Sequence, residues 1–323
     1  MQRLRDKERR RRDACLSYTT LGEYVQEFTW PKGSPDVKGL FDAASSKKYY
    51  KNCAFSCTAS EMLTLIPVLA CFFTRVVAPL NVCGAEVTSF LMCITVVEML
   101  QLARQGRVGP SQMMVAIRSH LDAFLRAYGA DKWRPKHHYS IHLPSMMKLH
   151  GFLLSCFCHE RKHRLVKRFA KHRANTTSFE IGTLEDVTIQ QLHDVARRWG
   201  AAVPSKPSKR QLKVLFEVFG ASDVVIANEV PSKHGAISVG DVVYYSVDGG
   251  CECGTVLAHA CCASVWYSVV QRWGKEEDGP TTSKYNVSHS PPLLLVQSAS
   301  LIGSVVYSLS KGVALVIKPP YMR

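Results

Sequence analysis

Apolar residues follow the period of a helix through the first two-thirds of the chain and the period of a strand after that. Thr58 stands three residues before Glu61 at the head of an apolar run, and this capping-box pattern predicts a helix start. The run over 62–77 is apolar on nearly every face, which predicts a helix surrounded by protein. Two more helices are expected over about 85–105 and over 110–129, between Pro110 and a stop at Gly129. Three helices with short joints predict a bundle.

The pattern changes after residue 130. The stretch 135–144 lies between two prolines and is expected to be extended. Helices are expected from the N-cap Ser155 to about Arg173, over about 184–199, and over 211–219. Beyond 220, strand signals occur in the stretches VGDVVYYSV, CGTVLAH, ASVWYSVVQRW, PPLLLV, SVVYSL and GVALVIK. Their regular spacing predicts a small barrel or sandwich, so the expected fold class is α+β.

These patterns divide the chain into four expected parts. Residues 1–57 form a basic arm, with four consecutive arginines over 9–12, and an irregular connection. Residues 58–200 form the helical region, 201–220 a linker with a short helix, and 221–323 a small all-β domain.

Charge separates the two ends of the chain. Its 323 residues include 41 Lys and Arg against 26 Asp and Glu, for a net charge of +15. Residues 1–220 carry 34 basic and 18 acidic residues and thus +16, whereas 221–323 carry 7 and 8 and thus −1. The helical and β parts are therefore expected to meet different partners.

The cysteines and the apolar segments argue against export and membrane insertion. Twelve cysteines in a long chain without a signal-peptide pattern are expected to be reduced and mostly buried. The most apolar stretch, 62–85, is interrupted by Arg75, Pro67 and Pro79, which favours buried helices over a membrane span. We therefore expect an intracellular chain with no transmembrane segment.

The basic segment 131–175 carries the strongest functional signal. It holds 11 basic and 2 acidic residues and 7 of the 12 histidines. Clustered Lys and Arg release counterions from a phosphate backbone, which gives salt-dependent binding with little sequence readout. The alternative is a merely soluble surface. The density favours nucleic acid, DNA before RNA.

The same segment also carries signals for metal binding, which are weaker than the signal for nucleic acid. His159 to His163 matches the zinc motif H-E-x-x-H, but Arg161 and Lys162 inside it are charged and no third ligand follows at a recognised spacing. Cys156 and Cys158 with these histidines form an alternative structural zinc site. Four cysteines suggest a second zinc site: Cys251, Cys253, Cys261 and Cys262. Their spacing suits zinc ligands poorly, so the favoured interpretation is that they are ordinary thiols.

Glu160 has two interpretations. On a helix it can pair with Arg164, which contributes a few tenths of a kcal/mol, or it can bind Mg²⁺ beside nucleic acid. Metal-dependent phosphoryl transfer needs several carboxylates close together, and this segment offers only Asp131 as a second acid. Glu160 alone is not an active site.

The string PKHHYSIHLP over 135–144, followed by GFLL over 151–154 and Glu160-Arg161, resembles the C-terminal part of DDE transposases of the CACTA and related eukaryotic superfamilies. The resemblance implies an RNase H-like core interrupted by a helical insertion, with residues 58–129 as part of that insertion. It implies Glu160 as the last catalytic, metal-binding acid and His138 and His142 as the motif histidines. It also fits an SH3-like or chromatin-reader-like β domain for 221–323.

The departures from this family define the expected function. The family's two catalytic aspartates lie upstream on strands of the core, and we expect this chain to lack them, because Asp36 and Asp42 lie in a connection rich in Gly, Pro and Ser. Phe152 also stands where the family has Pro. The chain is therefore interpreted as a truncated or repurposed, transposon-derived protein that binds nucleic acid without independent catalysis.

The sequence gives one expected function, nucleic-acid binding, and two alternatives to it. No cofactor is expected, with Mg²⁺ or Mn²⁺ needed only for an alternative strand-transfer or nuclease activity that uses Glu160. A second alternative is a chromatin- or peptide-binding module in 221–323 that uses its aromatic residues. DNA is the expected partner, the nucleus the expected location, and no membrane partner is expected. The nucleic-acid-binding residues are Lys136, His138, His142, Arg161, Arg164, Lys167, Arg168 and Lys171.

Overall fold

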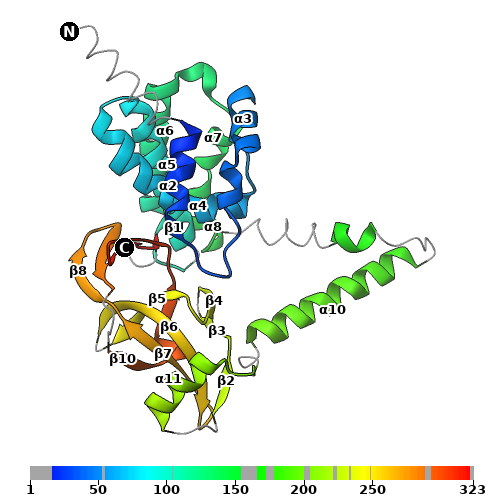
Figure 1. Ribbon diagram of the computed structural model, residues 1–323. Helices are drawn as coiled ribbons and strands as arrows, with labels where there is room; N and C mark the ends of the chain where they lie inside the picture. The colour runs from blue at the N-terminus through cyan, green and yellow to red at the C-terminus, as the bar shows by residue number, and fades with distance from the viewer. Residues whose placement is uncertain are drawn as a thin grey trace. The chain divides into compact units, whose positions relative to one another are not determined.

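The computed structural model describes residues 17–52, 55–103, 105–153, 166–171, 178–199, 204–220, 224–232, 234–247, 249–287 and 292–320 (Figure 1). It is a mixed α+β structure, as expected, with antiparallel sheets toward the C-terminus. The chain divides into two compact units. Unit 1 comprises 1–153, 272–291 and 304–323, and unit 2 comprises 154–271 and 292–303. The region 221–323, expected as one β domain, thus contributes strands to both units.

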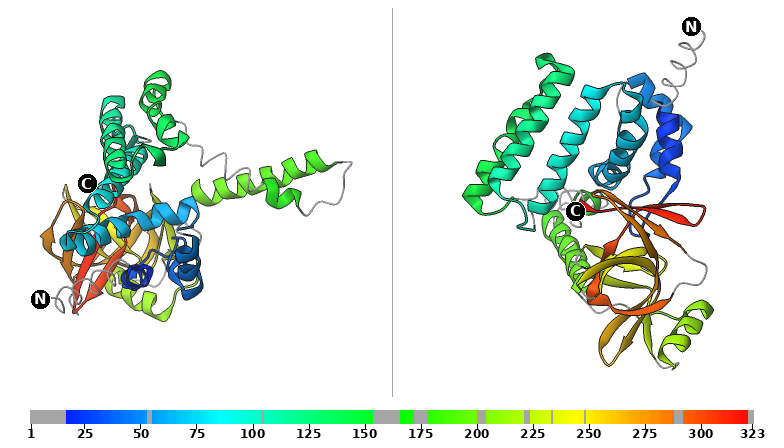
Figure 2. Two further views of the ribbon diagram at one scale, coloured as in Figure 1. Left: turned by 90° about the horizontal axis from the view of Figure 1, so that it is seen from above. Right: turned by 90° about the vertical axis from the view of Figure 1, so that its left-hand side faces the viewer.

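Helices dominate the first part of unit 1. Their order is α2 (Tyr18–Gln26), α3 (Ala43–Asn52), α4 (Ala59–Phe72), α5 (Gly84–Ala103), α6 (Pro110–Tyr128), α7 (Pro135–Ser140) and α8 (Leu143–His150). A π-helical turn, Phe73–Val77, and two 3₁₀ turns, Lys38–Phe41 and Ala78–Leu80, join some of them. Helices α5 and α6 lie side by side (Figure 2).

The structure confirms the predicted start of α4 and the predicted start and end of α6. The Thr58 side chain accepts from the Glu61 N–H at 3.3 Å, and the Glu61 carboxylate accepts from the Thr58 N–H at 2.6 Å, so the capping box is complete. Helix α6 begins at Pro110 and is capped by Gly129, whose φ of +79° favours glycine. The positions of these two helix starts follow from local chemistry alone.

The expectation of an extended 135–144 segment is wrong, because this stretch contains helix α7 and the start of α8. Each helix has its proline in the first turn: Pro135 in α7 and Pro144 in α8. The first N–H groups of a helix have no intrahelical partner, so a proline there loses nothing and its fixed φ suits the helix. Both prolines begin helices.

The described residues of unit 1 form three apolar clusters: a small one around Phe72, Val77 and Val87, and two larger cores that hold most of its helices. Side chains of α5, α6 and α8 share one core, which includes Val96, Met113, Ile117, Leu121 and Met147. The other joins α2, α4 and the last strand of the chain. Helix α4 buries Leu65, Val68 and Phe72 but leaves other positions half-exposed, so it is not enclosed on every face. The segment Ala59–Leu80 and helix α5 are long and apolar enough to span a membrane by length and composition alone.

Five strands complete unit 1. They are β1 (Phe28–Thr29), β8 (Gly274–Asp278), β9 (Thr282–Asn286), β12 (Tyr307–Ser310) and β13 (Val313–Ile317), in the antiparallel order β1-β12-β13-β9-β8. Phe28 pairs with Ser308, and Ile317 joins the core of α2 and α4. The C-terminal strands are therefore structural partners of the N-terminal helices, which no local pattern predicts.

Unit 2 contains a larger sheet and two described helices of eight or more residues. The sheet has the order β10-β7-β6-β5-β11, with β2 paired to β6, and β3 and β4 form a separate hairpin. Its strands are β2 (Val225–Ala227), β3 (Glu229–Ser232), β4 (Gly235–Ser238), β5 (Val242–Val247), β6 (Gly250–Cys262), β7 (Val265–Arg272), β10 (Leu293–Gln297) and β11 (Leu301–Ser304). The helices are α10 (Phe179–Trp199) and α11 (Lys209–Phe219). All six predicted strand stretches contain strands, while β1, β2, β3, β4, β8, β9 and nearly all of β11 were not predicted.

Candidate nucleic-acid interface

Helices α7 and α8 are positioned by apolar packing against α6. Pro144 and Met147 of α8 are buried, and Met147 joins the core formed by α5 and α6. The ring of His137 lies 4.3 Å from that of Phe124 and 5.3 Å from that of Trp133, measured between centroids. Its Nδ1 accepts from the Arg134 N–H at 3.1 Å. His137 is therefore a structural residue that fixes α7 to α6.

Three rings form a continuous exposed cluster next to this anchor. The rings of Tyr139 and His138 lie 6.1 Å apart, and those of His138 and His142 lie 5.0 Å apart, both with edge-to-face geometry. The Nε2 atoms of the two histidines are 3.3 Å apart, so one can donate to the other. All three residues are exposed, and Tyr139 keeps 65% of its surface accessible. We call His138, Tyr139 and His142 the ring cluster.

Cations accompany the ring cluster. Arg134, Lys136 and Lys148 are exposed, and within the described part of the chain no carboxylate lies within ion-pair distance of them. Lys132 is the exception, because Asp131 sits 3.6 Å away. Exposed cations without a carboxylate partner among the described residues keep their attraction for phosphate.

The second set of predicted basic residues is described only in part. Lys167, Arg168 and Lys171 are exposed, and the Arg168 guanidinium lies 5.0 Å from the centroid of the Phe169 ring. They belong to unit 2, whereas Lys136, His138 and His142 belong to unit 1. Glu160, Arg161 and Arg164 lie outside the described residues, as do Cys156, Cys158, His159 and His163. The ring cluster is thus the part of the predicted interface with a described geometry.

His138 and His142 have the spacing of two metal ligands. Two zinc–nitrogen bonds of about 2.0–2.1 Å at a tetrahedral angle place their nitrogens about 3.3 Å apart. A structural zinc site needs about four ligands, and among the described residues no three His, Cys, Asp or Glu side chains converge. The pair can therefore supply two ligands, and a buried metal site is not formed by the residues that the structure describes.

The cysteines of the β region are free thiols. Cys253 is buried in strand β6 and burial raises its pKa, whereas Cys262 at the end of the same strand is exposed. The expectation of mostly buried cysteines is wrong for the described part of the chain, where only two of eight are buried, Cys71 and Cys253. The other six are half-buried or exposed: Cys57, Cys83, Cys93, Cys251, Cys261 and Cys262.

Four described aromatic residues of 221–323 pack in the cores. Tyr244, Tyr245 and Trp273 are almost fully buried, and Trp266 packs partly buried against the core of unit 2. A methyl-lysine cage needs several exposed ring faces around one pocket. These four side chains therefore pack mainly in the cores, and the peptide-binding alternative stays a prediction.

One polar group, missed by the sequence reasoning, lies inside unit 2. His259 of β6 is fully buried; its Nδ1 is 2.8 Å from Ser268 Oγ and its Nε2 is 3.1 Å from the Ile237 carbonyl. Because a carbonyl only accepts, Nε2 carries the proton and Nδ1 accepts from Ser268, which in turn lies 2.9 Å from Ser298 Oγ. Burial lowers the pKa of His259 to about 4. We call His259, Ser268 and Ser298 the buried histidine network.

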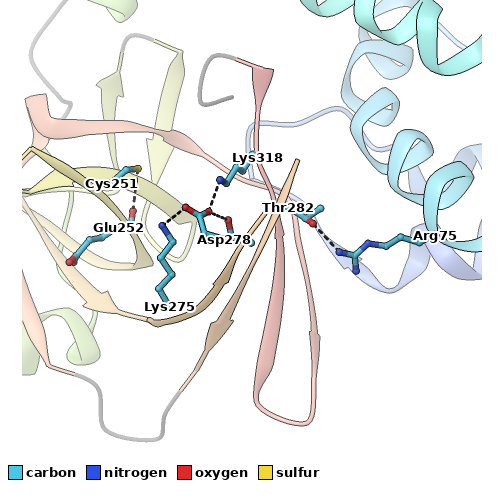
Figure 3. A network of polar contacts seen from close by, with 8 residues as sticks. Arg75, Cys251, Glu252, Lys275, Asp278, Thr282 and Lys318 are labelled. Atoms are coloured by element: carbon cyan, nitrogen blue, oxygen red, sulfur yellow. Dashed lines mark hydrogen bonds and ion pairs between the residues drawn. The ribbon is translucent and has the colours of Figure 1, made fainter. Parts of the chain in front are cut away.

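A second polar centre ties the C-terminal strands of unit 1 together (Figure 3). The Asp278 carboxylate accepts from Lys275 Nζ and from Ser283 Oγ, both at 2.7 Å, and pairs with Lys318. These hydrogen bonds hold the pKa of Asp278 well below its usual value. Arg75 also donates to Thr282 Oγ1 at 2.9 Å. Asp278 is thus saturated with structural partners and is not a candidate metal ligand.

Comparisons with known proteins give no relative to guide the assignment. No family model, no curated protein and no solved structure matches the chain. The functional argument therefore rests on the residues themselves.

Proposed function

We propose that this chain binds nucleic acid through the ring cluster and the cations around it, without catalysing a reaction by itself. The observation that carries the proposal is that helices α7 and α8 expose three neighbouring rings and, in the same stretch of chain, cations that have no described carboxylate partner. Cations attract the phosphate backbone, and exposed rings offer faces on which bases stack. Either feature alone is common on a protein surface; their combination favours a nucleic-acid strand.

The chemistry favours a single strand with accessible bases over a closed duplex. In a duplex the base faces are stacked on one another, so rings such as Tyr139 can meet only base edges or the backbone. In a single strand or a loop each base presents a face, and stacking on one aromatic residue is worth about 1–3 kcal/mol per base. DNA and RNA single strands both fit this chemistry.

The origin of the chain is part of the same proposal. The resemblance of 135–144 to CACTA-type transposases supports a transposon-derived protein in which α4, α5 and α6 correspond to the helical insertion and Glu160 to the last acid of an incomplete RNase H-like core. An SH3-like relationship of the β region and a nuclear location are inferred on the same basis. Among the described residues no observation favours the strand-transfer alternative, because Asp131 is exposed and pairs with Lys132.

A salt titration tests the electrostatic half of the proposal. Anisotropy of a labelled single strand between about 50 and about 200 mM salt should give a log–log slope of about −0.7 for each phosphate neutralised. Replacing Arg134, Lys136 and Lys148 with Ala should reduce the slope by about 2. The matched control replaces the exposed Lys47, Lys48 and Lys51 of α3, which removes equal charge from the same unit and should leave the slope nearly unchanged. A flat slope for the unaltered chain rejects the proposal.

A ring substitution tests the stacking half. Tyr139→Ala should weaken single-strand binding by about 10-fold or more, because one stacked base is lost, and should affect duplex binding little. Tyr139→Phe keeps the ring and should retain the affinity. Equal losses for Ala and Phe would assign Tyr139 a hydroxyl contact and reject stacking.

A further inference from the structure

His138 and His142 lie on one helical path although they belong to different helices. His138 is in α7, and His142 is the N-cap of α8. Ile141 and His142 both keep an α-helical backbone conformation, and the Ile141 N–H donates to the His138 carbonyl at 3.1 Å. Side chains four residues apart on such a path lie on the same side. The backbone therefore brings the two rings together.

The distances between the two rings fit one tetrahedral ion better than a straight hydrogen bond. Two Zn–N bonds of about 2.0–2.1 Å at a tetrahedral angle place the nitrogens about 3.3 Å apart and the ring centroids about 5.2 Å apart. The observed distances are 3.3 Å between the Nε2 atoms and 5.0 Å between the centroids. A collinear N–H···N bond with the same nitrogen separation would hold the centroids about 5.6 Å apart. The rings are therefore bent toward each other, as two ligands of one ion are.

The same distances select among metal ions. A square-planar ion such as Cu²⁺ holds neighbouring nitrogens at about 90°, which places them only about 2.8–2.9 Å apart. Hard ions such as Mg²⁺ take oxygen ligands instead. Two imidazole nitrogens at the tetrahedral spacing therefore suit Zn²⁺. The charge of Lys136, in the same helix as His138, opposes a dication, but water and salt screen charges at an exposed site.

Apolar packing fixes both helices before an ion binds. Helix α7 is held to α6 by the ring of His137, 4.3 Å from that of Phe124, and α8 is held by the buried Met147. Ligands on rigid elements lose little freedom when they bind. Both histidines are exposed, so an ion can reach them from solvent. With Nε2 bound to the ion, each ring carries its proton on Nδ1, which can donate to water.

We propose that His138 and His142 bind one Zn²⁺ ion at the surface of unit 1, with water at its two remaining positions. Two protein ligands make an open site, in contrast to the four of a structural zinc site. The ion takes the place of the contact between the two Nε2 atoms and links α7 to α8. This binding is independent of nucleic acid.

A zinc titration of the metal-free full chain against a chromophoric zinc indicator tests the proposal. His138→Gln and His142→Gln should each weaken the binding of one ion by more than about 10-fold, because loss of a mere hydrogen bond to a ligand already costs about 10- to 100-fold. The matched control is His150→Gln, an exposed histidine about 12 Å farther along α8. This control should leave the affinity unchanged, and circular dichroism should show that all three variants fold.

A second control separates this site from the other histidine pair with the same spacing. His159 and His163 lie outside the described residues, and His159→Gln with His163→Gln should leave the proposed site intact. A large excess of Mg²⁺ should not displace the ion, because Mg²⁺ prefers oxygen ligands.

Three results would overturn the proposal. The first is an unaltered chain that binds no more zinc than the variant with both His138→Gln and His142→Gln. The second is loss of the ion in either control variant, since other histidines then hold it. The third is displacement by Mg²⁺, which would assign the ion to oxygen ligands.

Discussion

The buried histidine network and the ring cluster use the same side chain in opposite ways. His259 is enclosed in the sheet of unit 2, and both of its nitrogens have partners. His138 and His142 stand on the surface of unit 1, and the described contact of their Nε2 atoms is with each other. The first histidine stabilises the fold through hydrogen bonds that are shielded from water, whereas the other two leave their ring faces exposed.

The difference teaches that the surroundings of a histidine decide its role, not its place in a dense motif. A buried hydrogen bond is costly to leave unmade, since its partners cannot turn to water. An exposed one is replaced by water at little cost. Substitution of the buried histidine should therefore lower stability, whereas substitution of the two exposed histidines should lower binding and leave stability nearly unchanged.

The largest expected effect is on stability at the buried histidine network. His259→Ala leaves the Ile237 carbonyl and the Ser268 hydroxyl without their partner and opens a cavity, and it should lower the free energy of unfolding by about 3–5 kcal/mol. Urea denaturation followed by circular dichroism measures it.

Two other variants keep this prediction testable. If His259→Ala does not fold, Ser298→Ala removes only the outer link to Ser268 and should lower the free energy of unfolding by about 1 kcal/mol. His193→Ala, on the exposed surface of α10, is the matched control and should change it by less than about 0.5 kcal/mol. A loss at His259 no larger than at His193 would contradict the assigned network.

The next effect is a pH dependence confined to unit 2. His259 takes up a proton near pH 6.5 when unfolded but only near its lowered pKa of about 4 when folded. The unfolded state thus binds more protons in this window, and the free energy of unfolding should fall by about 3 kcal/mol as pH drops from about 6.5 to about 4. Below that, both states are protonated and this contribution is constant.

Hydrogen exchange of the β6 amides reports on this window, since β6 carries His259. The contribution of Asp278 in unit 1 falls in a separate range, because its folded pKa is depressed: it is present above the unfolded value of about 3.9 and lost at lower pH. Asp278 is half-exposed, so its effect should be small. Faster β6 exchange only below about pH 4 would mean that His259 is not the group responsible.

Much of this fold could be predicted where the signal is local. The capping box at Thr58 and the stop at Gly129 depend on neighbouring residues, and the structure has both. The apolar runs that predicted β5 and β6 are also local, and both strands form. The pairing of β1 with β12 joins residues about 280 positions apart, and no window of sequence contains both strands. The short strands β2, β3 and β4 depend on such partners as well.

Some residues of the candidate site could likewise be predicted from local sequence, and others could not. Exposed cations such as Lys136 and Lys148 follow from charge density, which sequence reports directly. The prolines of 135–144 have two local readings, as breakers or as first-turn residues, and only packing of Met147 against α6 decides for helix. His259 belongs to no motif, and its one signal is that it stands inside a continuous apolar run of a strand.

The smallest expected effect on stability is at the ring cluster. His138→Gln with His142→Gln removes one exposed contact between two Nε2 atoms, and Gln retains a donor and an acceptor that water can also satisfy. The free energy of unfolding should stay within about 0.5 kcal/mol of the unaltered chain, since surface substitutions without buried partners seldom do more. The same pair should weaken single-strand binding several-fold, because two ring faces beside Tyr139 are lost. Denaturation and anisotropy on one preparation measure both. A loss of stability above about 1.5 kcal/mol with unchanged binding would make the pair structural, like His259, and would remove the distinction between the two regions.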